Sequence, residues 1–371
     1  MRSSRETSYE FFKASHFVAA FIFALFFFWH CDFRLSSWDY FIAAGIIYAL
    51  CFLYSQIRMY VEYGINHRAR LSLMPNDFIK VTIRGNFMWK PGQHIFIRFL
   101  GHGLHSLTTH PFTICSLPTL SNEDGLREMA FYIRARGGYT ARLQQYTEAH
   151  PNASLGVLLD GPYGGIHHEK LNVCNRLLII TGGSGAGFAL PLIEHFLILS
   201  TASQRHHEMP KSMTVVIVTR HSRTKIWFEE SLNDLISQYP ALSSSTNKLE
   251  ISIHLTNDND FDAGTNSSSS PSTLESKEVL ETSNPIPPGK GIHLSPSLGR
   301  PNLSDLINKE ISTPSTVTEQ HQSLGIFVCG PPGMQQDARV AAGKAQVQIL
   351  GKGAHTDGGV QEVYLHLEHF S

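Results

Sequence analysis

The chain has 371 residues, of which 42% are hydrophobic and 16% are charged, and its formal net charge is −1 at neutral pH. This length allows two domains and a smaller part, and the near-zero charge argues against a nucleic-acid partner. The five cysteines contain no CxxC pair. That pattern argues against a disulfide framework or a structural zinc site, and it favours a reducing compartment for most of the chain.

Two apolar segments open the chain. The first, residues 11–31, is interrupted by one lysine and two histidines, and the second, residues 40–57, contains no formal charge. A bilayer core takes about twenty helical residues, so both segments are long enough to span a membrane, the first only narrowly. A basic start followed by an apolar run also fits a secretory signal, but no small-residue cleavage site follows and a second apolar segment comes at once. We therefore expect a transmembrane helical hairpin in residues 1–64.

Basic residues flank this hairpin at its outer ends and indicate its orientation. They are Arg2, Arg5 and Lys13 at the first segment and Arg58, Arg68 and Arg70 after the second, whereas the connecting loop carries one arginine. By the positive-inside rule, both termini and everything after about residue 65 are cytosolic.

Short runs bounded by turn residues come next. They are DFIKVTIR, HIFIRFL, PFTICSL, EMAFYIRA and SLGVLLDG. Alternation of apolar and polar residues predicts half-buried strands. Because these strands are short and closely spaced, we predict a small antiparallel β-barrel over residues 65–168.

Unbroken apolar runs replace this pattern from residue 169. RLLIITGG and MTVVIVTR are typical of parallel strands buried on both faces, the helical run GFALPLIEHFLILSTA lies between them, and LEISIHLT and LGIFVCG continue the series. We predict an α/β nucleotide-binding domain over residues 169–371. The stretch 257–322 is rich in Ser, Pro, Asn and Thr. We expect a disordered insertion there, with a folded subdomain as the alternative.

A glycine-rich turn joins the first of these strands to its helix. Gly182, Gly183, Gly185 and Gly187 let the backbone approach a ligand closely, and the N-terminus of the helix offers N–H groups that suit a pyrophosphate. A tight structural turn would have the same composition. The flanking strand and helix favour a phosphate site.

The next strand ends in the segment TRHSRTKIW, which carries Arg220, Arg223 and Lys225. A domain that selects NAD usually has a carboxylate near this point for the ribose hydroxyls, whereas cations suit the 2′-phosphate of NADPH. We therefore expect NADPH rather than NADH. A solvated basic loop is the alternative interpretation.

The barrel half also carries candidate ligand residues. HPFTICSLP combines a histidine, an aromatic and a hydroxyl at a strand start, and IRARGGYTARL supplies Arg134, Arg136 and Thr140 ahead of a predicted helix. A flavin dinucleotide needs an aromatic or hydroxyl group beside its ring system, and cations with N–H groups for its pyrophosphate. Taken singly these are ordinary barrel strands. With a nucleotide domain downstream they indicate a flavin site, and the turns PGQHIFI and DGPYGG fit it.

The motif order PGQH, HPFT, IRARGGYT, GPYGG, TGGSGAG and CGPPGM resembles the ferredoxin–NADP reductase module of the ferric reductase/NADPH oxidase superfamily. In its details the chain is most similar to fungal ferric metalloreductases, and the resemblance covers nearly its whole length. It implies an NADPH-dependent flavoprotein of the plasma membrane. Such a protein passes electrons through FAD, and through haem in the full-length family, to ferric or cupric chelates in support of iron uptake.

The resemblance also implies roles for individual residues. FAD contacts would fall on His110, Pro111, Phe112, Thr113, Arg134, Gly138 and Thr140. Contacts to the NADPH pyrophosphate would fall on Gly182, Gly183, Ser184 and Gly185, and contacts to the nicotinamide on Cys329, Gly330, Pro331, Pro332 and Gly333. Thr113 and Cys329 would lie at the reacting rings, and Phe370 is the candidate for the terminal aromatic that covers the flavin in this family.

Two histidines lie in the first apolar segment. His16 and His30 are fourteen residues apart, which on a helix is roughly 21 Å along one face. Interfacial contacts would explain both, yet ionisable groups within a span are functional candidates by default. In the family this spacing supplies one axial ligand to each of two haem b groups. The chain has no second spaced pair in an apolar segment, so it resembles an N-terminally truncated family member or a half that needs partner helices.

Three other functions stay open at this point. A superoxide-generating NADPH oxidase shares the same modules. A haem-free diaphorase would reduce small acceptors at the cytosolic face. An inactive truncated subunit would bind nucleotides or partner helices without catalysis.

Overall fold

The computed structural model describes residues 3–31, 37–74, 78–101, 103, 108–120, 125–135, 137–201, 210, 212–239, 247–256, 292–313, 322–351 and 359–369. Contacts group the chain into two compact units. The first comprises residues 1–86, 95–112 and 132–162, and the second comprises residues 87–94, 113–131 and 163–371.

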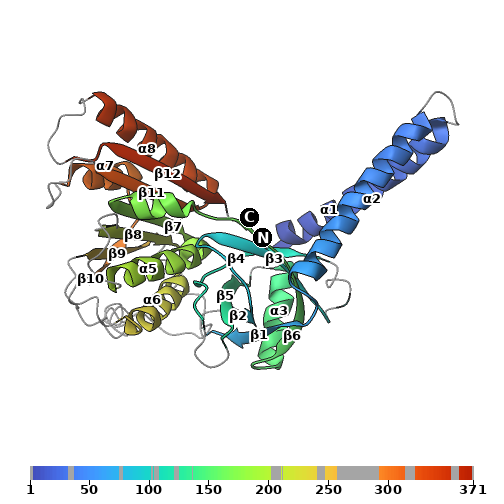
Figure 1. Ribbon diagram of the computed structural model, residues 1–371, viewed down its shortest axis with the longest axis horizontal. Coiled ribbons are helices and arrows are strands. Elements are labelled where there is room, and N and C mark those ends of the chain that lie inside the picture. Colours follow the sequence, from blue (N-terminus) through green and yellow to red (C-terminus); the bar gives the residue numbers. More distant parts are fainter. Residues whose placement is uncertain are drawn as a thin grey trace, which may run out of the picture. The chain divides into compact units, whose positions relative to one another are not determined.

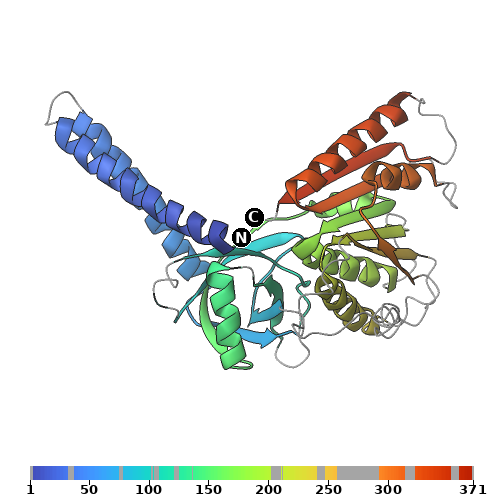
Figure 2. The ribbon, with the colours of Figure 1, turned by 180° about the vertical axis from the view of Figure 1, so that it is seen from behind.

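Two helices form the N-terminal hairpin: α1, Ser3–Cys31, and α2, Ser37–Glu62 (Figures 1 and 2). Among the described residues, α2 is the one helix long and apolar enough to cross a membrane, through the 25 residues Trp38–Glu62. The apolar part of α1, Ser15–Cys31, is shorter than the length required of a candidate span. The structure thus confirms a helix at both predicted segments and gives one candidate span. A second span in α1 stays a prediction.

The predicted antiparallel barrel is confirmed. Its six strands follow the order β4-β3-β6-β1-β2-β5, and β1 pairs antiparallel with both β2 and β6. Alternate residues such as Ala69, Leu71 and Val81 are fully buried, as the period of two requires. The bounds are β1 His67–Leu73, β2 Phe78–Gly85, β3 Gln93–Phe99, β4 His110–Thr113, β5 Arg127–Arg134 and β6 Ser154–Gly164, with helix α3 at Gly138–Ala149.

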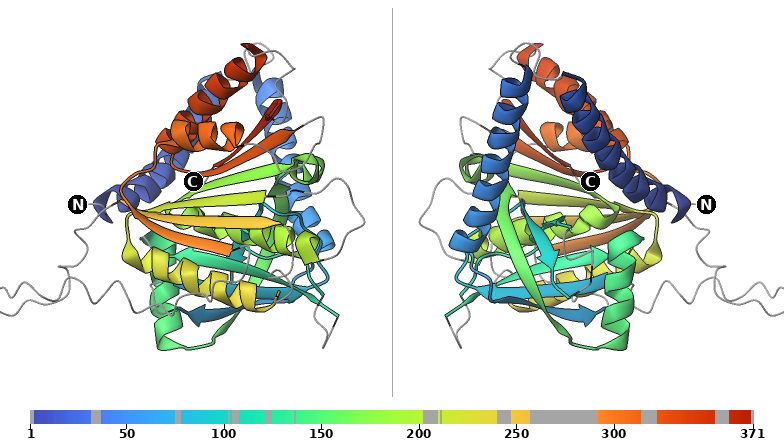
Figure 3. Two further views of the ribbon diagram at one scale, coloured as in Figure 1. Left: turned by 90° about the vertical axis from the view of Figure 1, so that its left-hand side faces the viewer. Right: turned by 90° about the vertical axis from the view of Figure 1, so that its right-hand side faces the viewer.

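The predicted α/β domain is also confirmed. A parallel sheet has the strand order β10-β9-β8-β7-β11-β12. Its strands are β7 Arg176–Gly182, β8 Ser212–Thr219, β9 Lys248–Leu255, β10 Ile292–Leu298, β11 Ser323–Gly330 and β12 Glu362–His369. Its helices are α4 His168–Val173, α5 Ala186–Thr201, α6 Ser222–Ser237, α7 Leu303–Ser312 and α8 Pro332–Gly351. Figure 3 shows α7 and α8 on one face of this sheet and α5 and α6 on the other.

One prediction needs correction. We expected disorder throughout residues 257–322, but residues 292–313 form the strand β10 and the helix α7. β10 pairs with β9 over its full length, and α7 begins at an Asn302 cap whose side chain accepts from the Ser304 N–H at 3.0 Å. Leu303 and Ile307 are buried in the core. This buried apolar face offsets the entropy cost of ordering the segment. Residues 257–291 and 314–321 lie outside the described residues.

A half-buried carboxyl group joins α5 to the segment that follows β4. The Leu117 N–H donates to Glu194 Oε2 at 3.2 Å, and the Tyr239 hydroxyl donates to Glu194 Oε1 at 3.4 Å. Burial raises the pKa of the Glu194 carboxyl above its ordinary value, although the two donors oppose that shift. The folded state therefore holds this proton more tightly than the unfolded chain does.

This carboxyl group makes stability depend on pH. A raised pKa in the folded state means that stability is lost as pH rises from about 4.5, the ordinary value, through the folded-state value. Glu194→Gln keeps an acceptor for Leu117 and has no charge to bury. We expect it to raise the apparent Tm at pH 8 by about 2–4 °C, with little effect at pH 4. Differential scanning calorimetry over this pH range measures both values.

Glu230→Gln is the matched control, because Glu230 is an exposed residue on α6. We expect no pH-dependent gain from it. An equal Tm gain for Glu194→Gln at pH 4 and pH 8 would show that the effect comes from packing rather than from charge.

Candidate dinucleotide and flavin sites

The parallel sheet reverses its winding between β7 and β11. From β7 the chain adds β8, β9 and β10 on one side, and it then returns to add β11 and β12 on the other side (Figure 1). In open α/β sheets, ligands bind outside the carboxyl ends of the strands at such a switch point. β7 ends at Gly182 and β11 ends at Gly330, so both predicted glycine motifs lie there.

Most glycines at this point are needed for close packing. A Cβ on Gly182 would lie 2.8 Å from Pro331 Cδ, and a Cβ on Gly330 would lie 2.7 Å from Met334 Sδ. A Cβ on Gly185 would lie 2.7 Å from the Cys329 carbonyl oxygen. The turn after β7 and the turn after β11 therefore pack backbone against backbone. Gly187 belongs to the same group, because its Cβ would lie 2.8 Å from the Cys115 sulfur.

Two glycines have a different role. Gly183 has a φ of +60°, and a Cβ added to it would meet no atom within 4 Å; Gly333 likewise has open space around it. Gly183 begins the 3₁₀ turn Gly183–Gly185 that leads into α5, and Gly333 lies in the first turn of α8. Helix N-termini present N–H groups and a positive dipole end, which suits phosphate. The backbone here fits a pyrophosphate. The side chain of Ser184 lies outside the described residues.

Cys329 is fully buried at the end of β11. Burial raises the pKa of its thiol far above the ordinary value, and the charges of Glu368 and Cys115 raise it further. The thiol is therefore protonated at physiological pH. A protonated, buried sulfur is a poor nucleophile, so Cys329 contributes shape rather than reactivity to the switch point. Pro331, Pro332 and Gly333 follow it on the exposed side.

The predicted cations follow β8, the strand beside β7. Arg220 is exposed directly after the strand, and Arg223 is exposed in the first turn of α6. Lys225 is half-buried and lies 3.7 Å from Glu229 Oε1 in an ion pair. The two arginines are the better candidates for a 2′-phosphate because both are exposed.

In the first unit, an aromatic cluster surrounds His110. Its imidazole stacks on Tyr139 with 4.7 Å between ring centroids and 10° between planes. Its Nε2 lies 3.1 Å from Thr108 Oγ1. Phe112 lies edge-on to Phe99 at 6.4 Å. His110 and Phe112 were predicted from the sequence, but no sequence signal pointed to Tyr139 and Phe99, which reach the cluster from α3 and β3.

The other predicted flavin residues lie around the start of α3. Arg134 ends β5 and is half-buried, Gly138 is exposed with a φ of +52°, and Thr140 Oγ1 donates to the Gly137 carbonyl at 2.9 Å. This glycine-rich helix start fits a second pyrophosphate for the same reason as the start of α5. Arg136 and Phe370 lie outside the described residues.

Pro111 and Thr113 complete β4. Pro111 is exposed. Thr113 is half-buried, and its carbonyl accepts from the Cys115 thiol at 3.4 Å. Neither geometry opposes the flavin role that the resemblance implies.

His16 and His30 are both exposed on the continuous helix α1. His16 stacks on Phe12 with 5.9 Å between ring centroids. α2 contains no histidine, so the hairpin offers one imidazole at each depth. Two helices of this kind do not complete a site for haem held by paired histidines. Among the described residues, no group of three metal-binding side chains occurs.

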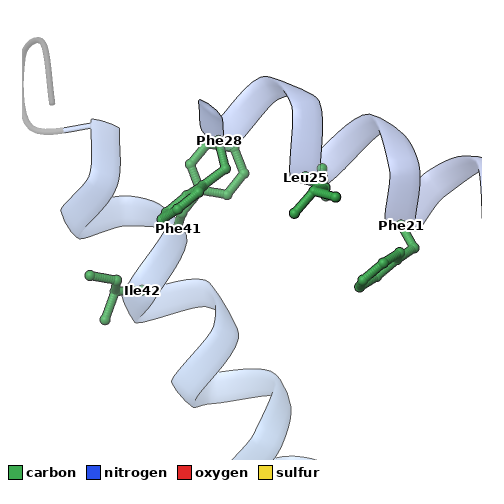
Figure 4. Close-up of a pocket in the computed structure, with 6 residues that line it drawn as sticks. Phe21, Leu25, Phe28, Phe41 and Ile42 are labelled. Atoms are coloured by element: carbon green, nitrogen blue, oxygen red, sulfur yellow. The ribbon is translucent and has the colours of Figure 1, made fainter. Parts of the chain in front are cut away.

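A cleft of about 240 Å³ lies between α1 and α2. Figure 4 shows its lining residues Phe21, Leu25, Phe28, Phe41 and Ile42, to which Ala24 adds a small side chain. Every one of these side chains is apolar. Sites for polar ligands carry a few converging polar groups, so this cleft is a feature of helix packing.

Gln335 is a further residue of the switch point, and the sequence did not predict it. Its side chain is buried on α8, and Nε2 donates to the Gly330 carbonyl at 2.9 Å and to the Glu368 carbonyl at 2.8 Å. It therefore joins the turn after β11 to the end of β12. A glutamine within a helix has no sequence pattern that predicts such a contact.

Comparisons with known proteins agree with this arrangement. Residues 174–342 match the family described as "Ferric reductase NAD binding domain", and residues 64–167 match a family described as "FAD-binding domain". The chain is 31% identical over 242 residues to the "Probable cell surface ferric reductase kap2" of Aspergillus oryzae, covering 62% of this chain and 31% of that protein. It is 28% identical over 358 residues to the "Ferric reductase transmembrane component 3" of Saccharomyces cerevisiae, covering 90% of this chain and 44% of that protein.

The chain thus spans less than half the length of these two relatives. A solved ferredoxin–NADP⁺ reductase from Neisseria gonorrhoeae, with bound FAD and NADP, is similar at a TM-score of 0.45 and 15% identity. The similarity covers 81% of this chain and 97% of that one.

Packing at Gly185 gives a stability prediction. Gly185→Ala places a methyl group 2.7 Å from the Cys329 carbonyl oxygen, so the two turns must move apart. We expect a loss of about 1–3 kcal/mol, measured by denaturant unfolding. Gly343→Ala, in an open position within α8, is the control and should gain about 0.5–1 kcal/mol. Equal effects from the two variants would contradict the packing argument.

The contacts of Gln335 give a second stability prediction. Gln335→Leu has nearly the same volume but leaves two buried carbonyls without their donor, so we expect a loss of about 1–3 kcal/mol and a correspondingly lower Tm. Gln336→Leu, at the exposed neighbouring position, is the control and should change stability by less than about 0.5 kcal/mol. A neutral Gln335→Leu would mean that these carbonyls are satisfied by other groups.

Proposed function

Because the chain belongs to the ferric reductase/NADPH oxidase superfamily, we propose that it is a membrane-bound flavoprotein reductase. It takes electrons from NADPH and passes them through FAD to ferric or cupric chelates, in support of iron uptake. The observation that carries the proposal is the pair of open glycines, Gly183 and Gly333, at the switch point between β7 and β11. The FAD-binding match over residues 64–167 supports the flavin.

NADPH supplies a hydride and FAD accepts it when both are bound. The N–H groups at the Gly182–Gly185 turn bind the NADPH pyrophosphate, and the guanidinium groups of Arg220 and Arg223 bind its 2′-phosphate. Cys329, Gly330, Pro331, Pro332 and Gly333 would hold the nicotinamide. The protonated thiol of Cys329 excludes water there without reacting.

The barrel holds FAD in this proposal. His110, Pro111, Phe112 and Thr113 flank the flavin from β4, with the Thr113 hydroxyl at the ring. Arg134, Gly138 and Thr140 bind its pyrophosphate, with help from the N–H groups at the start of α3. Phe370 is the proposed terminal aromatic, which would cover the flavin until the nicotinamide displaces it. The division into a hairpin (1–64), a barrel (65–168) and an α/β domain (169–371) belongs to the same proposal.

The hairpin anchors the two nucleotide-binding parts at the cytosolic side of the membrane, in this proposal the plasma membrane. His16 and His30 each offer one imidazole to a haem b group. The opposite ligands would have to come from helices other than α1 and α2, in a longer polypeptide or a partner.

A haem-free diaphorase is the second candidate. The lack of histidine in α2 favours it, because the hairpin alone then offers no complete haem site. Such an enzyme would reduce small acceptors at the cytosolic face without haem.

Purified full chain tests the proposal. We expect flavin absorbance and faster oxidation of NADPH than of NADH. Arg220→Ala with Arg223→Ala should lower kcat/KM for NADPH by about 10–100-fold and leave that for NADH unchanged, since a charge-assisted hydrogen bond contributes about 1.5–3 kcal/mol. Arg300→Ala with Lys344→Ala, both at exposed positions, is the control.

The acceptor is tested in the same preparation. Ferric citrate reduction that persists with superoxide dismutase supports the reductase, whereas reduction that the dismutase abolishes supports an oxidase. Absence of both flavin and NADPH oxidation would refute every enzymatic function. Reduced-minus-oxidised spectra with b-type haem bands would refute the haem-free candidate.

A further inference from the structure

Four cations share one outward face of the barrel sheet. β1 and β2 pair with Ala69 opposite Ile83 and Leu71 opposite Val81, and these inward residues are fully buried. The alternate residues therefore point outward. They include Arg68, Arg70, Lys80 and Arg84, which we call the basic face. Arg68, Arg70 and Arg84 are exposed and Lys80 is half-exposed.

Two arginines of the basic face, Arg68 and Arg70, lie opposite uncharged residues. Arg70 lies opposite Thr82 on β2 and Ser154 on β6, and Arg68 lies opposite Gly156 on β6. Arg84 is one residue beyond the Ala69–Ile83 pair, which places it beside Arg68. Positive charge is thus concentrated at this end of the β1–β2 ladder, where it attracts an anionic partner.

The basic face is held close to the end of the candidate membrane span. α2 ends at Glu62 and β1 begins at His67, so the intervening residues reach at most about 17 Å. The junction is fixed by several contacts in the same unit. The Tyr63 hydroxyl donates to the Gly161 carbonyl, His67 Nε2 contacts the Tyr63 carbonyl, and Arg98 donates to Gln56 on α2 at 3.5 Å.

We propose that the basic face binds the phosphate-bearing headgroups of anionic lipids in the membrane that α2 crosses. Guanidinium groups form paired hydrogen bonds with phosphate oxygens, and clustered basic residues immediately cytosolic of a span are attracted to anionic leaflets. The junction brings Arg68 and Arg84 into the headgroup layer first, because they lie at the end of the ladder nearest α2. This inference rests on the membrane placement in the proposed function.

A quenching experiment on the full chain tests the interaction. Ser154→Cys, an exposed position opposite Arg70, carries a fluorophore in a background of Cys31→Ser and Cys51→Ser; the other three cysteines are buried. The protein is placed in nanodiscs of phosphatidylcholine, with or without phosphatidylserine. A trace of lipid spin-labelled on its headgroup quenches probes at headgroup depth.

We expect quenching to rise as the phosphatidylserine fraction rises, and to fall again in about 1 M NaCl, where the Debye length is about 3 Å. Arg68→Gln with Arg70→Gln should lower the apparent binding constant for phosphatidylserine by about 30-fold, since each such arginine contributes about fivefold. Arg300→Gln with Lys344→Gln, two exposed cations of the other unit, is the matched control and should change nothing.

Quenching that ignores phosphatidylserine would overturn the proposal, as would equal losses in the arginine variant and the control. Flavin absorbance and Tm, measured on the same samples, show that each variant is folded. NADPH oxidation in the same discs reports separately on the proposed function, because Arg68 and Arg70 lie outside the residues assigned to either nucleotide. Extraction of the chain from membranes by alkaline carbonate would refute the placement of α2 and this inference with it.

Discussion

A Cβ on Gly185 would lie 2.7 Å from the carbonyl oxygen of Cys329, so the turn after β7 meets the end of β11 backbone to backbone. The rest of the α/β half depends on this contact. It sets how closely the starts of α5 and α8 approach each other, and it leaves Gly183 and Gly333 as the open backbone positions between them. Gln335 then fixes the second turn to β12. The close packing of these two turns therefore determines where the candidate phosphate site lies.

The local sequence pattern was sufficient to predict most of the strands and helices. The alternating run DFIKVTIR became β2, the unbroken runs RLLIITGG and MTVVIVTR became β7 and β8, and the glycine-rich segment became a strand–turn–helix unit. These features depend on neighbours in sequence. β1 also alternates, as HRARLSL, but it was not predicted as a strand. Its exposed arginines follow soon after the apolar helix α2, and there they fit the basic flank of a membrane span equally well.

What the sequence could not predict depends on contacts between distant residues or on composition that conceals a local signal. β10 and α7 lie in a stretch rich in Ser and Pro, yet Asn302 caps the helix and Ile307 buries its apolar side. The Pro296 position is tolerated because β10 is an edge strand. The stacking of His110 on Tyr139 joins β4 to α3. The roles of Gly183 and Gly185 look alike in sequence, and only the surrounding atoms separate them.

The burial of Cys329 has a chemical consequence for its susceptibility to oxidation. Peroxide and related oxidants attack the thiolate form of cysteine, and susceptibility follows both ionisation and access. A sulfur that is fully enclosed and keeps its proton offers neither. If Cys329 lines a nicotinamide site, as proposed, an oxidisable sulfur there is held in its least reactive form.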